Sequence, residues 1–169
     1  NADPLTGDGT GVTIQIPYEL LTDYLSSLDS DVPSPDDLAL AMVFLPHDES
    51  ARPKAREVLE EQCRAVGIDV LGWRVVPTEP SLLGPQALDS MPGFEQLFLR
   101  RPADQQGPHF DRSLYLARRR AERTYRDASI ECYVVSMSST VVVYKGMMVA
   151  NRLGQFFPDL MDERVVSSI

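Results

Sequence analysis

Two spacings of apolar side chains alternate along the chain, and they predict strands and helices in turn. Val12, Ile14 and Ile16 alternate with polar residues, which is typical of a half-buried strand. The unbroken apolar run Leu38–Leu45 favours a strand covered on both faces. Apolar residues three and four positions apart predict helices between the strands. The predicted strands are 11–16, 38–45, 68–76, 94–99, 130–135 and 140–144, and the predicted helices are 18–28, 51–66, 111–127 and 149–157.

The order of these elements indicates the fold class. From Leu38 onward they run strand, helix, strand, strand, helix, strand, which is the order of a ferredoxin-like split βαβ unit. Ser50 is expected to cap the helix 51–66, and Gly67 is expected to end it in the left-handed conformation. We therefore expect an α+β domain that contains a self-contained lobe.

The strand 68–76 carries the single tryptophan of the chain. In a regular strand Leu71, Trp73 and Val75 point to one face, and that face needs an apolar cover. The apolar stripe of the helix 51–66 can supply it. We expect Trp73 to be buried against that helix.

Composition and charge exclude several classes of protein. Apolar residues make up 43% and charged residues 24%, which is typical of a folded chain. The formal net charge of −9 repels phosphate backbones and anionic lipids, so we expect neither nucleic acid nor membrane as a partner. No apolar run is long enough to cross a bilayer and no signal pattern opens the chain, and we expect a soluble, cytoplasmic protein. Because the sequence begins at Asn1 rather than Met, it is interpreted as a fragment.

Glycines and histidines at two places could carry chemistry. Gly7, Gly9 and Gly11 precede a strand, whereas nucleotide-binding glycines lie between a strand and a helix, so a tight turn is the favoured interpretation. His47 could pair with a neighbouring carboxylate as an acid/base unit, but a histidine in a loop before a helix is favoured. With His109 it makes only two histidines, 62 residues apart, which is not a metal site.

Arginines and cysteines offer the remaining candidates. Six arginines lie between 112 and 126 on one predicted helix, where they form either a docking face or, as favoured here, a solvated face. We expect Arg119, Arg123 and Arg126 to face solvent or a neighbouring chain. Cys63 and Cys132 lie 69 residues apart without CxxC spacing and are predicted core residues in a reducing environment. The residues thus provide no complete catalytic, cofactor-binding or metal-binding constellation.

Several short stretches along the chain can be compared with known families as one ordered set. They are TGDGTG at 6–11, MVFL at 42–45, LGWR at 71–74, FEQLF at 94–98, LYLARRR at 114–120, YVVSMS at 133–138, VYKGM at 143–147 and FFPDL at 156–160. Taken together they resemble one family, the glutaminase domain of the large subunit of glutamate synthase, a type-2 glutamine amidotransferase. Their order and spacing agree across nearly the whole chain.

The resemblance implies an N-terminal-nucleophile hydrolase. In that family a terminal cysteine, with its own α-amino group as the base, attacks the amide of glutamine, and ammonia passes through a tunnel to 2-oxoglutarate. The half of the parent enzyme that makes glutamate is expected to contain FMN and an iron–sulfur cluster. Expected partners are the remaining domains of the large subunit and a small subunit. The electron donor stays open between a nicotinamide-dependent partner and ferredoxin.

The resemblance also implies that the active residues lie outside this chain. The nucleophilic cysteine of the family lies upstream of Asn1, its glutamine-binding arginine follows Ile169, and its oxyanion-hole pair lies further on. We therefore expect no catalytic residue, no bound cofactor and no metal ligand in this segment, and no glutaminase activity from it alone.

Shorter members of the family imply a division of the chain into three parts. Their glycine turn and Lys-Gly pair, here Lys145 and Gly146, are separated by far fewer residues. We expect a partial αββα sandwich in which 1–17 supplies a core strand, 18–129 forms an inserted α/β lobe of ferredoxin-like order, and 130–169 returns to the core as a strand hairpin and a helix. A non-catalytic ligand-binding or protein-interaction module is the alternative, and the split βαβ order and the arginine-rich helix are its motivation.

Overall fold

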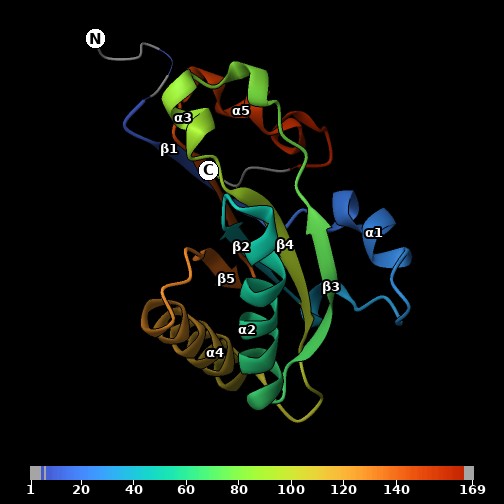
Figure 1. Cartoon of the computed structure of the whole chain (residues 1–169). Coiled ribbons are helices and arrows are strands. Elements are labelled where there is room, and N and C mark those ends of the chain that lie inside the picture. The colour runs from blue at the N-terminus through green and yellow to red at the C-terminus, as the bar shows by residue number, and fades with distance from the viewer. Residues whose placement is uncertain (1–4, 6, 166–169) are drawn as a thin grey trace.

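The computed structural model describes residue 5 and residues 7–165, and it shows a mixed α+β fold (Figure 1). The strands are β1 (Thr10–Gln15), β2 (Leu38–Leu45), β3 (Asp69–Val75), β4 (Gly93–Arg100), β5 (Tyr133–Ser138) and β6 (Val141–Gly146). The helices are α1 (Tyr18–Ser26), α2 (Arg52–Ala65), α3 (Pro85–Asp89), α4 (Gly107–Asp127) and α5 (Leu153–Phe156). Short 3₁₀ turns precede or follow several of them, and the one at Pro158–Met161 (η5) matters below. Within the described residues no helix is long and apolar enough to cross a membrane.

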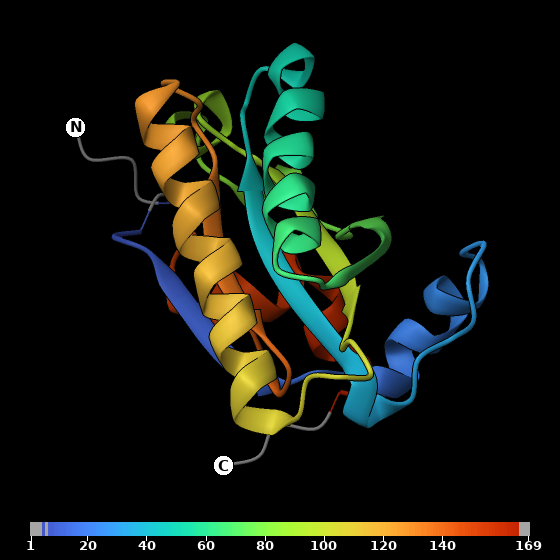
Figure 2. The same cartoon turned by 90° about the horizontal axis from the view of Figure 1, so that it is seen from below.

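Two antiparallel sheets form the framework. β2 to β5 build a four-stranded sheet in the order β3-β4-β2-β5, and β1 pairs with β6 in a sheet of two strands. The predicted order strand, helix, strand, strand, helix, strand from Leu38 onward is present, with α3 added before β4. α2 and α4 lie side by side across one face of the larger sheet (Figure 2).

The alternating faces of β2 explain how these layers hold together. Leu40 and Met42 join an apolar cluster with Tyr144 of β6, whereas Ala41 and Val43 join a second cluster with the helices α2 and α4. All four are fully buried, so the prediction of a strand covered on both faces is confirmed. The stack is therefore a helix layer, the four-stranded sheet and the two-stranded sheet.

The predicted hairpin between the last two strands is wrong. β5 pairs with β2 in the large sheet, while β6 pairs with β1, so the sharp turn at Ser139 and Thr140 carries the chain from one sheet to the other. β5 also begins and ends three residues later than predicted, since Ser136 and Ser138 are within it. The polar stretch SMSS at 136–139 is typical of a loop, but the hydroxyls of Ser136 and Ser138 accept hydrogen bonds from backbone amides near β6, which makes these serines compatible with the strand.

Helix ends differ from the prediction in two places. The side chain of Asp48, not that of Ser50, caps the 3₁₀ turn Glu49–Ala51 by accepting a hydrogen bond from the amide of Ser50 at 2.9 Å, and α2 itself has no side-chain cap. Gly67 ends α2 with φ +84°, as predicted. The predicted helix 149–157 is present as a 3₁₀ turn, Ala150–Arg152, that runs directly into α5, and it ends at Phe156 because Pro158 starts a new turn.

Trp73 packs where it was predicted, although the reasoning was wrong. It is partly buried against the cluster that includes α2, and its indole Nε1 donates a hydrogen bond to Glu60 Oε1 at 2.7 Å. The pairing of β3 with β4 shifts between Val70 and Gly72, which turns Leu71 to the opposite cluster. Val75 is 72% exposed, so these three residues do not share one buried face.

Candidate functional site

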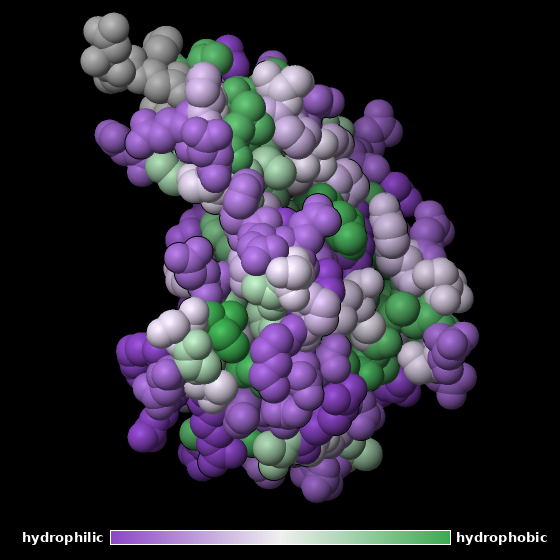
Figure 3. Space-filling model, viewed as in Figure 1, coloured by the Kyte–Doolittle hydropathy of each residue, from purple (hydrophilic) through white to green (hydrophobic). Residues whose placement is uncertain are grey.

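A cleft of about 810 Å³ lies where the end of the two-stranded sheet meets the large sheet. Figure 3 shows this side of the molecule hollowed between the part that carries α3 and the part that carries α4. Its walls come from the start of β1, the ends of β2 and β6, the starts of β4 and β5, α3 and α5. The lining residues used below are Gly9, Gly11, Phe44, His47, Met91, Phe94, Cys132, Tyr133, Lys145, Gly146, Met147, Met148 and Phe156.

The glycine turn forms one rim of the cleft by packing tightly on the end of β6. Gly9 has φ +107°, which favours glycine, and this agrees with the predicted turn. A Cβ on Gly11 would lie 2.7 Å from Cβ of Lys145, and one on Gly7 would collide with the carbonyl oxygen of Met148. Glycine is therefore required here for the close approach of two backbones.

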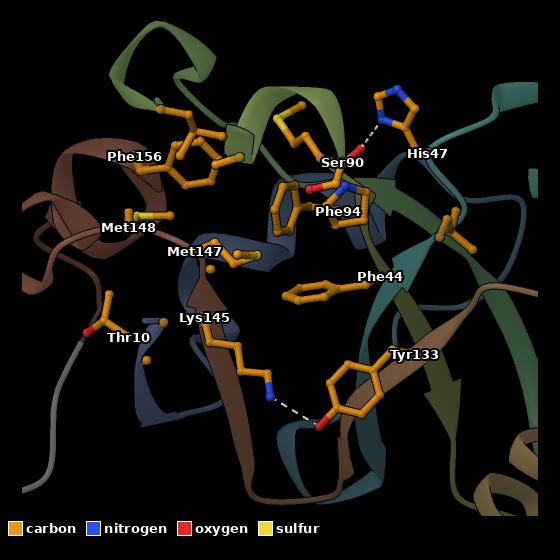
Figure 4. Close-up of a pocket in the computed structure, with 18 of the residues that line it drawn as sticks. Thr10, Phe44, His47, Ser90, Phe94, Tyr133, Lys145, Met147, Met148 and Phe156 are labelled. Atoms are coloured by element: carbon orange, nitrogen blue, oxygen red, sulfur yellow. Dashed lines mark hydrogen bonds between the residues drawn. The ribbon is translucent and has the colours of Figure 1, made fainter. Parts of the chain in front are cut away.

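Lys145 is the cation of the cleft. Its Nζ donates a hydrogen bond to the hydroxyl of Tyr133 at 3.1 Å and lies 4.6 Å from the centre of that ring (Figure 4). The two residues come from different sheets, so the contact depends on the crossover between β5 and β6. An ammonium group held over an aromatic ring at the rim of a cleft can bind an anionic group such as a carboxylate.

Aromatic rings and methionines form the deeper wall. Phe94 lies 4.9 Å from Phe44 and 5.5 Å from Phe156 between ring centres, in edge-to-face contacts. Met147 and Met148 follow the Lys-Gly pair, and Met147 is 49% exposed in the open cleft (Figure 4). The site thus combines the Lys145 ammonium group and two acidic residues, Asp8 and Glu131, with an apolar floor.

The structure separates the two histidines. His47 lies at the cleft, where its Nδ1 is 2.6 Å from the carbonyl oxygen of Met91 and therefore carries the donated proton. The adjacent Asp48 caps the turn before α2 and is not paired with His47. His109 is exposed at the start of α4, away from the cleft. In the part of the chain that the structure describes, no three metal-ligating side chains come together.

The two cysteines lie in different parts of the fold, but the pKa of each thiol is raised. Cys63 is fully buried between α2 and the large sheet, and burial raises the pKa of its thiol to about 12. Cys132 reaches the cleft, but burial also raises the pKa of its thiol to about 11. Both thiols are free, and neither environment favours the thiolate that a nucleophile needs.

We expect both cysteines to react slowly with iodoacetamide in the folded chain. A raised pKa leaves only a small thiolate fraction at pH 8, so the rate should increase about tenfold for each pH unit up to about pH 10. Cys132, which is partly exposed, should react before Cys63. Mass spectrometry of the labelled peptides measures this, with the chain in urea as the control in which both react fast. Rapid labelling of Cys132 at pH 7 would contradict the expectation.

Sequence reasoning missed a buried polar network between the two sheets. Arg74 of β3 donates two hydrogen bonds to Asp159 of η5, at 2.7 and 2.8 Å. Tyr144 of β6 donates to the same carboxylate at 2.7 Å, and Gln96 of β4 accepts from Arg74 and donates to Tyr144. All four side chains are nearly inaccessible to solvent. The arginine in the LGWR stretch and the aspartate in FFPDL were visible in the sequence, but only the fold shows that they meet.

Comparison with known proteins gives a consistent result. A sequence model of the family described as "Glutamine amidotransferases class-II" matches residues 1–169. The chain is 39% identical over 168 residues to a ferredoxin-dependent glutamate synthase 2 of Synechocystis. The match covers 99% of this chain and 11% of that protein.

Two further relatives show the same pattern of coverage. A chloroplastic ferredoxin-dependent glutamate synthase of rice is 36% identical over 96% of this chain and 10% of its own length. The large chain of an NADPH glutamate synthase of Azospirillum brasilense is 33% identical over 99% of this chain and 11% of its own length. The chain therefore spans about a tenth of the curated relatives that it matches.

Proposed function

The chain belongs to the class-II glutamine amidotransferases, and we propose that it forms part of the glutaminase domain of a glutamate synthase large chain. This domain releases ammonia from glutamine, and the rest of the parent enzyme uses the ammonia for the reductive synthesis of glutamate from 2-oxoglutarate. Similarity to both ferredoxin-dependent and NADPH-dependent synthases over nearly the whole chain supports the proposal.

One structural observation carries the proposal. The glycine turn at 7–11 and the pair Lys145-Gly146 are separated by more than a hundred residues, yet they pair as β1 and β6 and line one cleft. These are the two stretches that shorter amidotransferases of this type place close together in sequence. We propose that this cleft faces the residues of the active site that other parts of the parent supply.

The two sheets suggest how the chain divides into a core part and an inserted lobe. We propose that 1–17 and 130–169 belong to the αββα sandwich of N-terminal-nucleophile hydrolases and that 18–129 is the inserted lobe of ferredoxin-like order. The apolar cluster between the two sheets supports a sandwich, since facing sheets pack through such a layer. β5 joins the two parts, because it pairs with β2 of the lobe and leads directly into β6.

In the proposed reaction the parent's terminal thiol attacks the amide carbon of glutamine while the terminal amine takes its proton. The tetrahedral intermediate collapses with release of ammonia, and water then cleaves the thioester to give glutamate. Cys63 and Cys132 take no part, because burial raises the pKa of each thiol. The part played by this chain is to shape one wall of the cleft and to hold the turn against β6.

FMN and the iron–sulfur cluster would be held elsewhere in the parent. The chain has two cysteines, one buried between α2 and the large sheet and the other at the cleft, so they do not form a cluster-binding set. Its proposed partners are glutamine, the remaining domains of the large chain and a small subunit. We propose a cytoplasmic location, while the rice relative is chloroplastic by name.

The decisive experiment compares the parent with this chain for ammonia release from glutamine. We expect turnover by the parent and none by the 169-residue chain, because three groups must converge within a few ångströms and the chain lacks the thiol at a terminus. Parent variants Cys63→Ser and Cys132→Ser should keep their turnover. A parent without glutaminase activity would support the alternative, a non-catalytic module, and loss of turnover in a folded Cys132→Ser parent would show that the nucleophile was misplaced.

A further inference from the structure

The outer face of α4 is unlike the rest of the molecule in charge. α4 carries six arginines and three acidic residues, whereas the whole chain has a formal net charge of −9. At about 100° per residue, Arg112, Arg119 and Arg123 fall in one narrow arc of the helix. The opposite arc carries the buried residues Leu114, Ala117, Ala121 and Tyr125. As predicted, Arg119, Arg123 and Arg126 are exposed.

Much of this positive charge is not neutralised locally. Glu122 accepts hydrogen bonds from both Arg118 and Arg119, at 2.9 and 3.1 Å, and Asp127 pairs loosely with Arg123 at 3.7 Å. Asp111, the third acidic residue, accepts a hydrogen bond from Ser139. Among the residues that the structure describes, Arg112, Arg120 and Arg126 have no acidic partner. Three guanidinium groups are thus free to bind something else.

Two large apolar side chains lie within the same exposed face. Tyr115 is 62% exposed and Leu116 is 38% exposed, on either side of the line through Arg112 and Arg119. Tyrosine and arginine are the residue types that are enriched where proteins bind one another.

The position of α4 leaves this face open to a partner. α4 lies on the outside of the helix layer, beside α2, with the large sheet behind it (Figure 2). About nine tenths of the length of the curated relatives lies outside the region matched by this chain. Protein surface able to cover the face would therefore be close by in a parent of that length.

We propose that the face formed by Arg112, Tyr115, Leu116, Arg119, Arg120 and Arg123 docks onto an acidic surface of another domain of the parent chain. The arginines supply charge complementarity, and Tyr115 and Leu116 supply the apolar centre. The inference rests on the proposed function only in that the chain is part of a longer polypeptide. It assigns to α4 an assembly role, separate from the cleft.

The test reads the accessibility of position 115 rather than activity. Tyr115→Cys is made in the 169-residue chain and in the parent purified free of nucleic acid, and maleimide labelling of the peptide containing position 115 is followed by mass spectrometry. We expect labelling to be at least about tenfold slower in the parent. Ser30→Cys, in the exposed acidic loop between α1 and β2, is the control and should label equally fast in both. Leu116→Cys is a second reporter on the same face.

A second arm tests the charge of the partner. Adding Arg112→Glu and Arg120→Glu to the Tyr115→Cys parent should restore labelling at position 115 to within about twofold of the isolated chain. These two arginines have no acidic partner within the described chain, so the change breaks no ion pair there.

Equal labelling at position 115 in parent and chain would overturn the proposal, and so would protection that survives the charge reversal. Protection of the isolated chain by added single-stranded RNA, without protection in the parent, would assign the face to nucleic acid instead. A parent that fails the ammonia assay but protects position 115 would refute the proposed function and keep this inference.

Discussion

Replacing Asp159 by alanine should lower the free energy of unfolding of this chain by about 3–5 kcal/mol, because the change leaves a buried guanidinium group without its counter-charge. Arg74 is 3% exposed and donates two of its hydrogen bonds to Asp159, and Tyr144 would lose its acceptor as well. The remaining contacts of Arg74, to Gln96 and to the ring of Tyr24 at 4.2 Å, do not replace a carboxylate. Urea unfolding followed by the fluorescence of Trp73 measures the loss.

A neighbouring aspartate provides the matched control. Asp162 also pairs with an arginine, Arg164 at 2.8 Å, but both side chains are partly exposed to water. Asp162→Ala should therefore cost far less stability than Asp159→Ala, because water screens this pair. The double change Arg74→Met with Asp159→Leu should lose less stability than Asp159→Ala alone, since it removes both charges together. A loss below about 1 kcal/mol for Asp159→Ala would show that water reaches the network.

Replacing Phe157 by alanine should lower the free energy of unfolding by about 3–5 kcal/mol, the usual range for deleting a buried aromatic ring. The ring is fully buried and lies 4.7 to 5.3 Å from the centres of Phe94, Phe156 and Tyr144. It thereby fastens the C-terminal turns to both sheets. Truncation to alanine leaves a cavity in the apolar cluster between the two sheets. The paired strands keep the two sheets in place, so the surrounding side chains cannot fill that cavity.

Two further variants test whether the loss of stability in Phe157→Ala comes from the missing ring or from any change in the C-terminal turns. Phe157→Leu keeps much of the volume and should cost less than half as much as the alanine change. Met161→Ala, at a side chain that is 71% exposed, should change stability by no more than about 0.5 kcal/mol. Similar losses for Phe157→Ala and Met161→Ala would mean that the C-terminal turns do not depend on the aromatic cluster.

Both predictions concern how the end of the described chain is held near the candidate site. Tyr144 precedes Lys145 on β6, so the network that anchors Asp159 also borders the strand that carries the cation of the cleft. Phe156, next to Phe157, lines the cleft itself. Changes at Asp159 are therefore expected to affect the cleft through Tyr144, and changes at Phe157 through Phe156.

Local sequence patterns were sufficient to predict most helices and strands, but not which other elements they pack or pair with. The apolar run at 38–45 and the stripe of α4 were recognisable because burial on two faces, or on one, leaves a periodic record in the sequence. α3 was missed, because five residues in a segment rich in proline and glycine leave no period to detect. The bulge that turns Leu71 away from Trp73 was also hidden, since one extra residue changes the face without changing the composition.

The candidate site could be predicted only in part for the same reason. The glycines at 7–11 indicated a turn by themselves, whereas the pairing of Lys145 with Tyr133 needs two sheets to meet at a crossover. His47 was noticed as a loop residue, but its contact with the carbonyl of Met91 joins segments that are 44 residues apart. Contacts of this kind have no local signal.

By itself, the sequence determined the α+β class, the order of the elements, the exposed arginine face of α4 and, through a series of matching stretches, the family. Tertiary structure decided that β5 and β6 lie in different sheets, that Arg74 meets Asp159, and that the glycine turn and Lys145 share a cleft. The physical reason is the range of the forces involved. Periodicity and turn chemistry act between residues a few positions apart, whereas strand pairing and buried charge pairs are decided by which distant surfaces exclude water together.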